Sequence, residues 1–405
     1  TVNRPVRWHR HRGRAGRTRP LARTLARPAS RPVSRRLPRP LARSLLTLVL
    51  LVCSAAPMAA CGSGTPAGTT LSVLASAELT DLRPVLDELR RDTGITLQLE
   101  FGGTVSASDL LGSGRADRHD LAWLSSDRWL RLNLKAAGGT GAPLSTRTMM
   151  SPLVLGVKRS TADRLWPGGG ERQPSWADIA GAAERGQLRY AMTDPNVAHS
   201  GLAALVAVAT AGAGTGEALR PEDVAQDRVR GFLAGRTLAA ASTHALVDNY
   251  LDHQNDTDAV IAYESDLLAL DGDGRLREPL DLVYPQDGIV LSDYPLLLLD
   301  PAKRTAYDRV LAWLLAPAAQ KKIMRLTLRR PVDPTVARDP RLERPIGNAL
   351  YFPDRPEVVQ RLLAQYEADT PATATGPSRP PAASQTPAPS RTEEPSRTPT
   401  PSRTP

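Results

Sequence analysis

Short apolar runs alternate with amphipathic stretches along the chain from Leu71 onward. Three of the runs predict strands: LSVLA (71–75), ITLQLEF (95–101) and HDLAWL (119–124). Between the first two strands, one helical face collects Leu79, Leu82, Val85, Leu86 and Leu89, and Thr93-Gly94 supplies its stop. A shorter helix is predicted near 106–111. This strand and helix order predicts a parallel, doubly wound α/β sheet.

A second series of the same kind follows. It predicts strands at 151–157, 188–192, 259–263 and 281–285, and helices at 175–186, 200–212, near 221–234 and near 243–253. The strand PLLLL (295–299) comes next, before a helix whose apolar face is Tyr307, Val310, Leu311, Leu314 and Leu315. The pattern therefore predicts two α/β units.

The start of the chain has the features of an export segment. Residues 1–60 hold 14 Arg and no acidic residue, and Leu45–Cys53 is an apolar run with the length of a signal-peptide core. Ala59-Ala60-Cys61 resembles a bacterial lipobox, which implies lipidation of Cys61 and a tether at 61–69. The alternative is cleavage by ordinary signal peptidase, which would leave a secreted protein with a free thiol.

The last residues, 369–405, are rich in Pro, Ser and Thr, and PSRT recurs at 389, 395 and 401. Such a composition cannot bury a core, so a disordered tail or linker is predicted.

Charge and cysteine content exclude several functions. The formal net charge is +10, but residues 61–370 hold 34 basic and 40 acidic residues, so the basicity belongs to the ends and no nucleic-acid partner is expected. The two cysteines, Cys53 and Cys61, both precede the α/β region, which therefore has no disulfide and no thiol metal site.

Several segments resemble the type 2 periplasmic-binding fold of bacterial extracellular solute-binding proteins. They are VLASAEL (73–79), RRDTGITLQLEFGGT (90–104), SPLVLGV (151–157), TDP with HSGLAAL (193–205) and AVIAYESDLL (259–268). The likeness is strongest to actinobacterial substrate-binding lipoproteins related to the molybdate-binding group, which are often fused to a von Willebrand factor A domain.

The resemblance implies two doubly wound lobes joined by a hinge. The first lobe would be discontinuous, formed by 70–148 and 291–368, and the second would span 149–290. MSPLVLGV (150–157) and YPQDGIVLSDYP (284–295) would carry the chain between them.

Candidate ligand-binding residues follow the predicted strands or open the predicted helices, where backbone amides of a doubly wound sheet point outward. They are Ser76, Gly103, Thr104, Ser125, Ser126, Ser200, Gly201 and Tyr263. This set is neutral and rich in hydrogen-bond donors, which suits a small polar or anionic ligand. Ser76 and Ser200 could instead be N-caps that stabilise helices by about 1 kcal/mol each.

Two acidic residues near this set, Asp194 and Glu264, would repel an oxyanion. They could bind an amine or a sugar hydroxyl, or face solvent as turn residues. Enzymatic and metal chemistry have little support, because His119, His199, His244 and His253 show no H-E-x-x-H spacing and no G-x-S-x-G occurs. His119 and His199 are expected in turns, and no cofactor is expected.

The sequence thus predicts a non-enzymatic, exported solute-binding lipoprotein on the outer face of the cell membrane. It would be a monomer that delivers its ligand to an ABC-type permease. The alternative is a cell-envelope interaction or assembly module that keeps the fold without transport.

Overall fold

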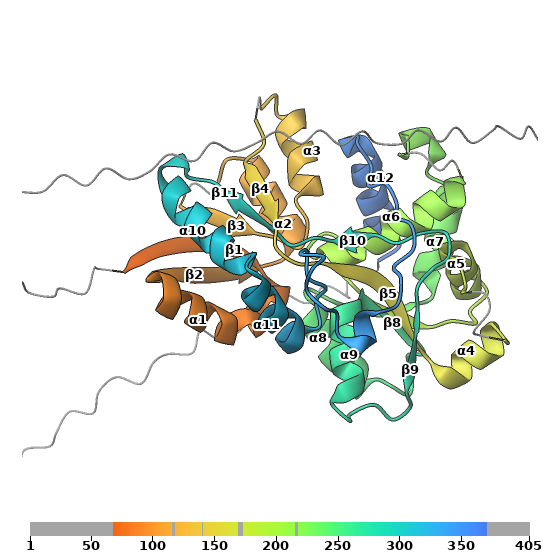
Figure 1. Ribbon diagram of the computed structural model, residues 1–405. Helices are drawn as coiled ribbons and strands as arrows, with labels where there is room; N and C mark the ends of the chain where they lie inside the picture. The colour runs from red at the N-terminus through yellow and green to blue at the C-terminus, as the bar shows by residue number, and fades with distance from the viewer. Residues whose placement is uncertain (1–67, 116–117, 140, 169–172, 215–217, 371–405) are drawn as a thin grey trace, which may run out of the picture. The chain divides into compact units, whose positions relative to one another are not determined.

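The computed structural model describes residues 68–115, 118–139, 141–168, 173–214 and 218–370. In these residues the chain forms two α/β lobes, each built around its own sheet (Figure 1). The predicted export segment with Cys61, and nearly all of the predicted tail, lie outside the described residues.

The first lobe surrounds a sheet that has five strands in the described residues, in the order β2-β1-β3-β11-β4. These strands are β1 (Thr69–Ser76), β2 (Ile95–Gly102), β3 (Leu121–Trp123), β4 (Leu144–Arg147) and β11 (Pro295–Leu298). β1 pairs with β2 and β3 in parallel, as predicted, whereas β11 is antiparallel to both β3 and β4. The carboxyl ends of β1, β2 and β3 therefore meet at one edge.

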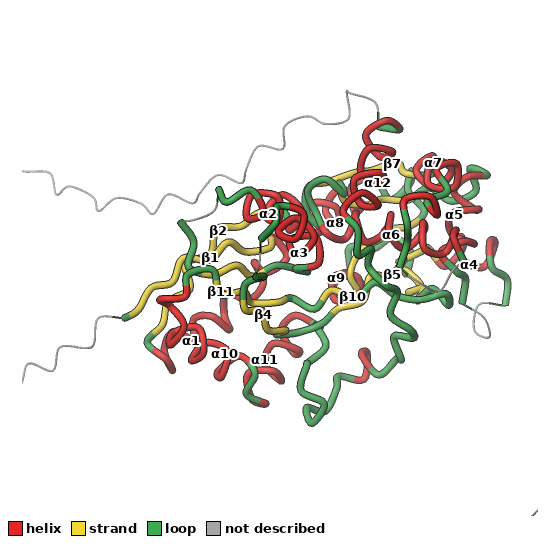
Figure 2. Tube along the Cα trace, turned by 90° about the horizontal axis from the view of Figure 1, so that it is seen from above, coloured by secondary structure: helices red, strands yellow, loops and turns green. Residues whose placement is uncertain are grey.

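Helices cover both faces of this sheet. They are the 3-10 helix η1 (Ala77–Leu82), α1 (Arg83–Thr93), α2 (Thr104–Gly112), α3 (Arg128–Ala136), the 3-10 helix η3 (Pro301–Lys303), α10 (Arg304–Leu314) and α11 (Pro317–Thr327). Figure 2 shows α1, α10 and α11 on one face and α2 and α3 on the other. The single helix predicted from Leu79 to Leu89 is divided into η1 and α1, and α1 ends at Gly94 with a left-handed φ of 69°.

The second lobe surrounds a sheet ordered β10-β5-β8-β6-β7 in the described residues, with β9 also paired to β5. Its strands are β5 (Ser151–Lys158), β6 (Tyr190–Thr193), β7 (Arg236–Ala240), β8 (Ala259–Tyr263), β9 (Leu280–Val283) and β10 (Leu291–Ser292). Its helices are α4 (Arg159–Leu165), α5 (Trp176–Glu184), α6 (His199–Ala213), the 3-10 helix η2 (Pro221–Asp223), α7 (Gln226–Ala234), α8 (Thr243–Asp252) and α9 (Glu264–Gly272). α6 is buried on nearly all sides, which explains its almost continuous apolar sequence.

The chain passes between the lobes in three places. It runs from β4 to β5 through 148–150 and from β10 to β11 through 293–294. After α11, Arg330 pairs with Met150 in an isolated antiparallel bridge, so a third segment lies beside the first. Among the described residues, the non-glycine residues with positive φ are Tyr294 (39°) and Leu328 (56°). Each lies at a passage, and such conformations persist only where the surrounding structure holds them.

The C-terminal residues differ from the predicted lobe boundary. After the 3-10 helix η4 (Pro340–Leu342), the chain forms α12 (Pro356–Ala368), which packs on α6 and α7 of the second lobe (Figure 1). Val358, Val359 and Leu362 are fully buried in an apolar cluster of mostly second-lobe residues, which also contains Val105, Trp129 and Leu132 of the first lobe. The predicted boundary placed these residues in the first lobe, whereas α12 contacts α6 and α7 of the second lobe and also α3 of the first.

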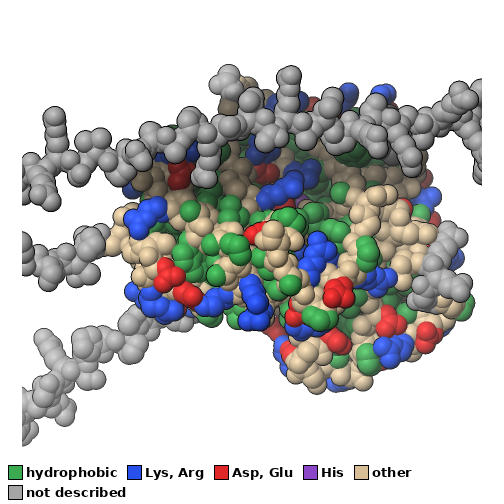
Figure 3. Space-filling view, in the orientation of Figure 1, with side chains coloured by type: hydrophobic (Ala, Val, Ile, Leu, Met, Phe, Trp, Pro, Cys, Tyr) green, Lys and Arg blue, Asp and Glu red, His purple; other side chains and the backbone are tan. Residues whose placement is uncertain are grey.

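Basic and acidic side chains are interspersed on the face seen in Figure 3, with apolar side chains between them. That face carries no broad field of one sign.

Candidate functional site

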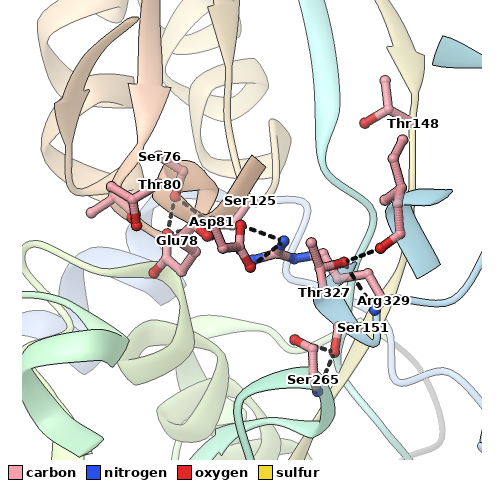
Figure 4. Close-up of polar contacts among 12 residues, drawn as sticks. Ser76, Glu78, Thr80, Asp81, Ser125, Thr148, Ser151, Ser265, Thr327 and Arg329 are labelled. Carbon is pink, nitrogen blue, oxygen red and sulfur yellow. Dashed lines mark hydrogen bonds and ion pairs between the residues drawn. The ribbon is translucent and has the colours of Figure 1, made fainter. Parts of the chain in front are cut away.

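Hydroxyl groups from the carboxyl ends of three parallel strands meet at the edge of the first sheet, and Figure 4 labels two of the residues, Ser76 and Ser125. Ser76 ends β1, Thr104 follows β2 and Ser125 follows β3. The Ser76 and Ser125 hydroxyl oxygens are 2.7 Å apart, and the Thr104 hydroxyl lies 3.1 Å from each. All three side chains are buried. The structure thus brings these predicted site residues into one group, which we call the hydroxyl cluster.

The remaining first-lobe candidates have structural contacts. The Ser126 hydroxyl accepts a hydrogen bond from the backbone N–H of Arg128 at the start of α3, at 3.3 Å. Gly103 allows a close approach of backbone, since a Cβ atom there would lie 2.3 Å from the carbonyl oxygen of Val197. The absence of a side chain at Gly103 therefore allows the two lobes to pack closely at this point.

The second-lobe candidates lie opposite. The Ser200 hydroxyl is 2.7 Å from that of Thr193 and 3.4 Å from that of Thr243. Gly201 allows the start of α6 to approach β6, because a Cβ atom there would lie 2.3 Å from the Thr193 carbonyl oxygen. The Ser200 side chain points into a hydroxyl pair instead of capping its own helix.

Tyr263 and His199 form a buried pair, with 3.0 Å between the phenol oxygen and Nδ1. His199 is the first residue of α6, so its expected place in a turn is wrong. Burial, assisted by Arg128, lowers the pKa of His199 to about 3. Burial also raises the pKa of Tyr263, and the Glu78 carboxylate raises it further. Both side chains are therefore neutral at physiological pH.

Glu78 lies within the hydroxyl cluster and makes the site acidic. Its carboxylate accepts hydrogen bonds from Ser76 and Ser125 (3.1 Å to the latter) and, from the second lobe, from Thr243 at 3.4 Å. The sequence-based expectation of a neutral site is therefore wrong. The physical reason is η1, which starts directly after β1 and turns Glu78 back over the strand end. The sequence signal that could have revealed this carboxylate is Glu78 itself, which stands two residues after Ser76 at the end of the predicted strand.

Arg329 is buried beside this group and was not predicted. Its Nη1 lies 2.9 Å from both carboxylate oxygens of Asp81, and its Nη2 donates to the Glu78 carbonyl oxygen at 2.6 Å (Figure 4). The guanidinium also lies over the Tyr294 ring, 4.9 Å from its centre. Arg329 thus joins the third passage to the first lobe.

The two acidic residues expected near the site have other roles. Glu264 is fully buried and binds Arg330 through two hydrogen bonds of 2.7 Å, and it also accepts one from Tyr284. It therefore does not face solvent. Asp194 is a turn residue whose carboxylate accepts from the backbone N–H of Asn196 at 2.9 Å.

The two lobes are in direct contact around this site. The backbone N–H groups of Val105 and Ser106, at the start of α2, donate to the Val197 carbonyl oxygen of the second lobe at 2.9 and 3.4 Å. Val105 and Trp129 also belong to the same apolar cluster as α6 and α12. The amides that the sequence assigned to a ligand therefore bind the opposite lobe in this arrangement.

A family comparison decides what kind of protein this is. Residues 71–325 match the model of a family described as bacterial extracellular solute-binding protein. The chain belongs to that family. It is a binding protein and not an enzyme, as the sequence predicted. No curated protein sequence matches significantly.

Solved structures show the same fold for this solute-binding protein. The periplasmic binding protein AfuA from Actinobacillus pleuropneumoniae, with fructose-6-phosphate bound, is 13% identical, with a TM-score of 0.58 over 74% of this chain and 98% of that one. A periplasmic thiamin binding protein is 13% identical, with a TM-score of 0.57 over 74% and 96%. An ABC transporter substrate binding protein from Agrobacterium tumefaciens is 16% identical, with a TM-score of 0.56 over 76% and 96%. These likenesses confirm the predicted two-lobe fold of the type 2 periplasmic-binding class.

No helix in the described ranges is long and apolar enough to cross a membrane.

Proposed function

We propose that this protein captures a small polar solute between its lobes and delivers it to an ABC-type importer. The observation that carries the proposal is the meeting of Glu78 with hydroxyls of both lobes, Ser76 and Ser125 from the first and Thr243 from the second. Such a group of convergent polar side chains at a doubly wound sheet edge suits a hydrogen-bonding ligand.

The three passages between the lobes provide the hinge that release would need. Tyr294 and Leu328 hold left-handed conformations at two of the passages. Hinges are a few residues that absorb large changes of φ and ψ.

The ligand class follows from charge more than from fold. Of two solved structures with this fold, one has fructose-6-phosphate bound and the other is named for thiamin, so the fold does not specify the ligand. The sequence left polar and anionic ligands open. Glu78 disfavours an oxyanion in contact with the hydroxyl cluster, because two like charges in a desolvated site repel strongly.

Lipid anchoring at Cys61 is proposed from the sequence alone, on Ala59-Ala60-Cys61. Mass spectrometry of the native protein should find a lipidated Cys61 at the mature N-terminus, and Cys61→Ser should shift the protein into the medium. An unmodified Cys61 on a secreted protein would contradict the anchor.

The second candidate is an envelope interaction module. It is favoured by one observation: the hydroxyl cluster is satisfied by its own members, and the α2 amides by Val197. A site in this state needs no solute to remain closed.

Binding measurements distinguish the two. A thermal-shift screen of amines, oxyanions, amino acids, polyols and short sugars should give a hit, because a solute at 100 times its dissociation constant stabilises by about 2.7 kcal/mol. Ser125→Ala and Tyr263→Phe should weaken the hit at least tenfold, while Ser113→Ala, an exposed hydroxyl at the end of α2, should not. No hit from any class would favour the interaction module.

A further inference from the structure

Helix α12 is attached to the second lobe by polar contacts as well as by its apolar face. Arg361 donates to the carbonyl oxygen of Pro221 in η2 at 2.6 Å. The guanidinium of Arg236, in β7, lies over the Tyr366 ring, 4.5 Å from its centre. Arg236 also donates to the hydroxyl of Thr370, just after the helix, at 3.0 Å. Because these partners all belong to the second lobe, α12 should move with that lobe.

The segment that leads into α12 is held along the second lobe as well. The backbone N–H of Ile289 donates to the Asn348 carbonyl oxygen, and the N–H of Leu350 donates to the Ile289 carbonyl oxygen, each at 2.8 Å. Phe352 then packs on the ring of His199, the first residue of α6, with 6.2 Å between the ring centres. The chain is therefore fixed to the second lobe from a point just before β10 as far as α12.

Another side of α12 contacts the first lobe. The helix packs against α3 as well as against α6 and α7. Val105, Trp129 and Leu132 of the first lobe are buried in the same apolar cluster as Val358 and Leu362 of α12. If the lobes separated while α12 stayed on the second lobe, the contact between α3 and α12 would break. Apolar surface would then return to water, which is unfavourable.

This apolar contact differs in kind from the hydrogen bonds between α2 and the second lobe. The Val105 and Ser106 amides bind the Val197 carbonyl oxygen in the closed arrangement. On opening, the same amides can bind water, so the net stabilisation from these hydrogen bonds is small. Water offers apolar side chains no equivalent partner. The contact of α3 with α12 should therefore contribute more to closure than the α2 hydrogen bonds do.

We propose that the contact between α3 and α12 is a clasp that holds the two lobes closed in the absence of solute. The second lobe carries α12, and α3 leaves it when the lobes open. The inference goes beyond the proposed function, because it concerns the equilibrium of the protein alone. A weaker clasp populates the open form, and any solute that binds the closed form then binds more weakly in proportion.

The test compares two leucines of α3 in the full chain without solute. Leu132 lies in the cluster shared with α12, whereas Leu130 is fully buried in a separate cluster of first-lobe residues. Leu132→Ala should weaken the clasp. Leu130→Ala is the matched control, because it should lower the melting temperature without acting on the contact with α12.

Two measurements report opening. The first is the hydrogen-exchange rate of the Val105 and Ser106 amides, which bind across the lobes. Leu132→Ala should raise this rate at least tenfold, and Leu130→Ala should leave it within about twofold of the unchanged protein. The second is the radius of gyration from small-angle X-ray scattering, which should increase for Leu132→Ala alone.

Four results would overturn the clasp. Leu132→Ala might leave both the exchange rate and the radius unchanged. Faster exchange at an unchanged radius would mean that α2 had loosened within its own lobe. A larger radius without faster exchange would mean that the α2 hydrogen bonds had not opened. Equal effects of Leu130→Ala and Leu132→Ala would show a general loss of stability in α3.

A second variant keeps the test valid if Leu132→Ala does not melt cooperatively. Leu132→Val removes one methylene and should raise the exchange rate about threefold. An unchanged rate for Leu132→Val would overturn the clasp in that case. All of these measurements are made without solute, so a failure of the clasp leaves the proposed function to be decided by its own thermal-shift screen.

Discussion

Arg329 and Arg330 are consecutive residues whose guanidinium groups bind carboxylates of opposite lobes. Arg329 binds Asp81 in the first lobe, and Arg330 binds Glu264 in the second with two hydrogen bonds of 2.7 Å. Both arginines are buried. The third passage between the lobes is thereby fixed on each side, so movement of the lobes must take place around it.

The Arg330 pair gives the first prediction. Glu264→Gln leaves a buried guanidinium without its counter-charge, so the free energy of unfolding should fall by about 3–5 kcal/mol in urea denaturation. Replacing both partners, Glu264→Leu with Arg330→Met, should lower the free energy of unfolding by much less. Asp308→Asn breaks the exposed ion pair with Arg304 and should lower the free energy of unfolding by less than about 1 kcal/mol. Equal losses for the buried and the exposed pair would contradict this account of the passage.

Helix α12 gives the second prediction. Leu362 is fully buried in the apolar cluster that joins α12 to the rest of the protein, so Leu362→Ala should lower the free energy of unfolding by about 2–5 kcal/mol. Gln360 lies on the exposed face of the same helix, and Gln360→Ala should change it by less than about 0.5 kcal/mol. If both variants unfold at the same denaturant concentration as the unchanged protein, α12 does not belong to this apolar cluster.

The approach of α2 to Val197 gives the third prediction. A methyl group at Gly103 would lie 2.3 Å from the Val197 carbonyl oxygen, so Gly103→Ala should separate the lobes and destabilise the closed form by about 1–3 kcal/mol. Small-angle X-ray scattering should show a larger radius of gyration. Gly102→Ala is the matched control, because a Cβ atom there meets nothing within 4 Å. An unchanged radius for Gly103→Ala would mean that the lobes are not held together here.

Asp266 gives a prediction on the pH dependence of stability. Its folded-state pKa of about 6 is higher than the ordinary aspartate value, so the folded state binds more protons between these two values. The contribution of Asp266 to stability should therefore increase as the pH falls from 7 toward 4. Asp266→Asn should be more stable than the unchanged protein at pH 7.5, and the difference should disappear near pH 4. Urea denaturation across this range measures it, and a constant difference would show that Asp266 does not titrate as described.

Periodicity predicted the positions of most strands, but not their order in the sheets, because buried strands and amphipathic helices have distinct patterns. β1, β2, β5 and β8 appear where the apolar runs predicted them. Periodicity did not predict β7 or α12. β7 is a half-exposed strand, so it lacks a continuous apolar run. The position of α12 depends on which surface, distant in sequence, buries its apolar face. Local sequence does not contain that information.

The candidate site was predictable in its hydroxyl groups but not in its charges. Ser76, Thr104 and Ser125 follow strands, and parallel strands place their carboxyl ends together. Glu78 depends on the 3-10 turn after β1, and Arg329 reaches the site from 251 residues away in sequence, through its bond to the Glu78 carbonyl. Contacts of such separation arise from tertiary packing alone.

The central claim is that a solute is held between the lobes by groups from both. Amide hydrogen exchange with and without the strongest stabilising compound of the thermal-shift screen tests it most directly. The account predicts added protection in both lobes, around Glu78 and Ser125 in the first and around Ser200 and Thr243 in the second. Protection confined to one lobe, or located away from these residues, would contradict it.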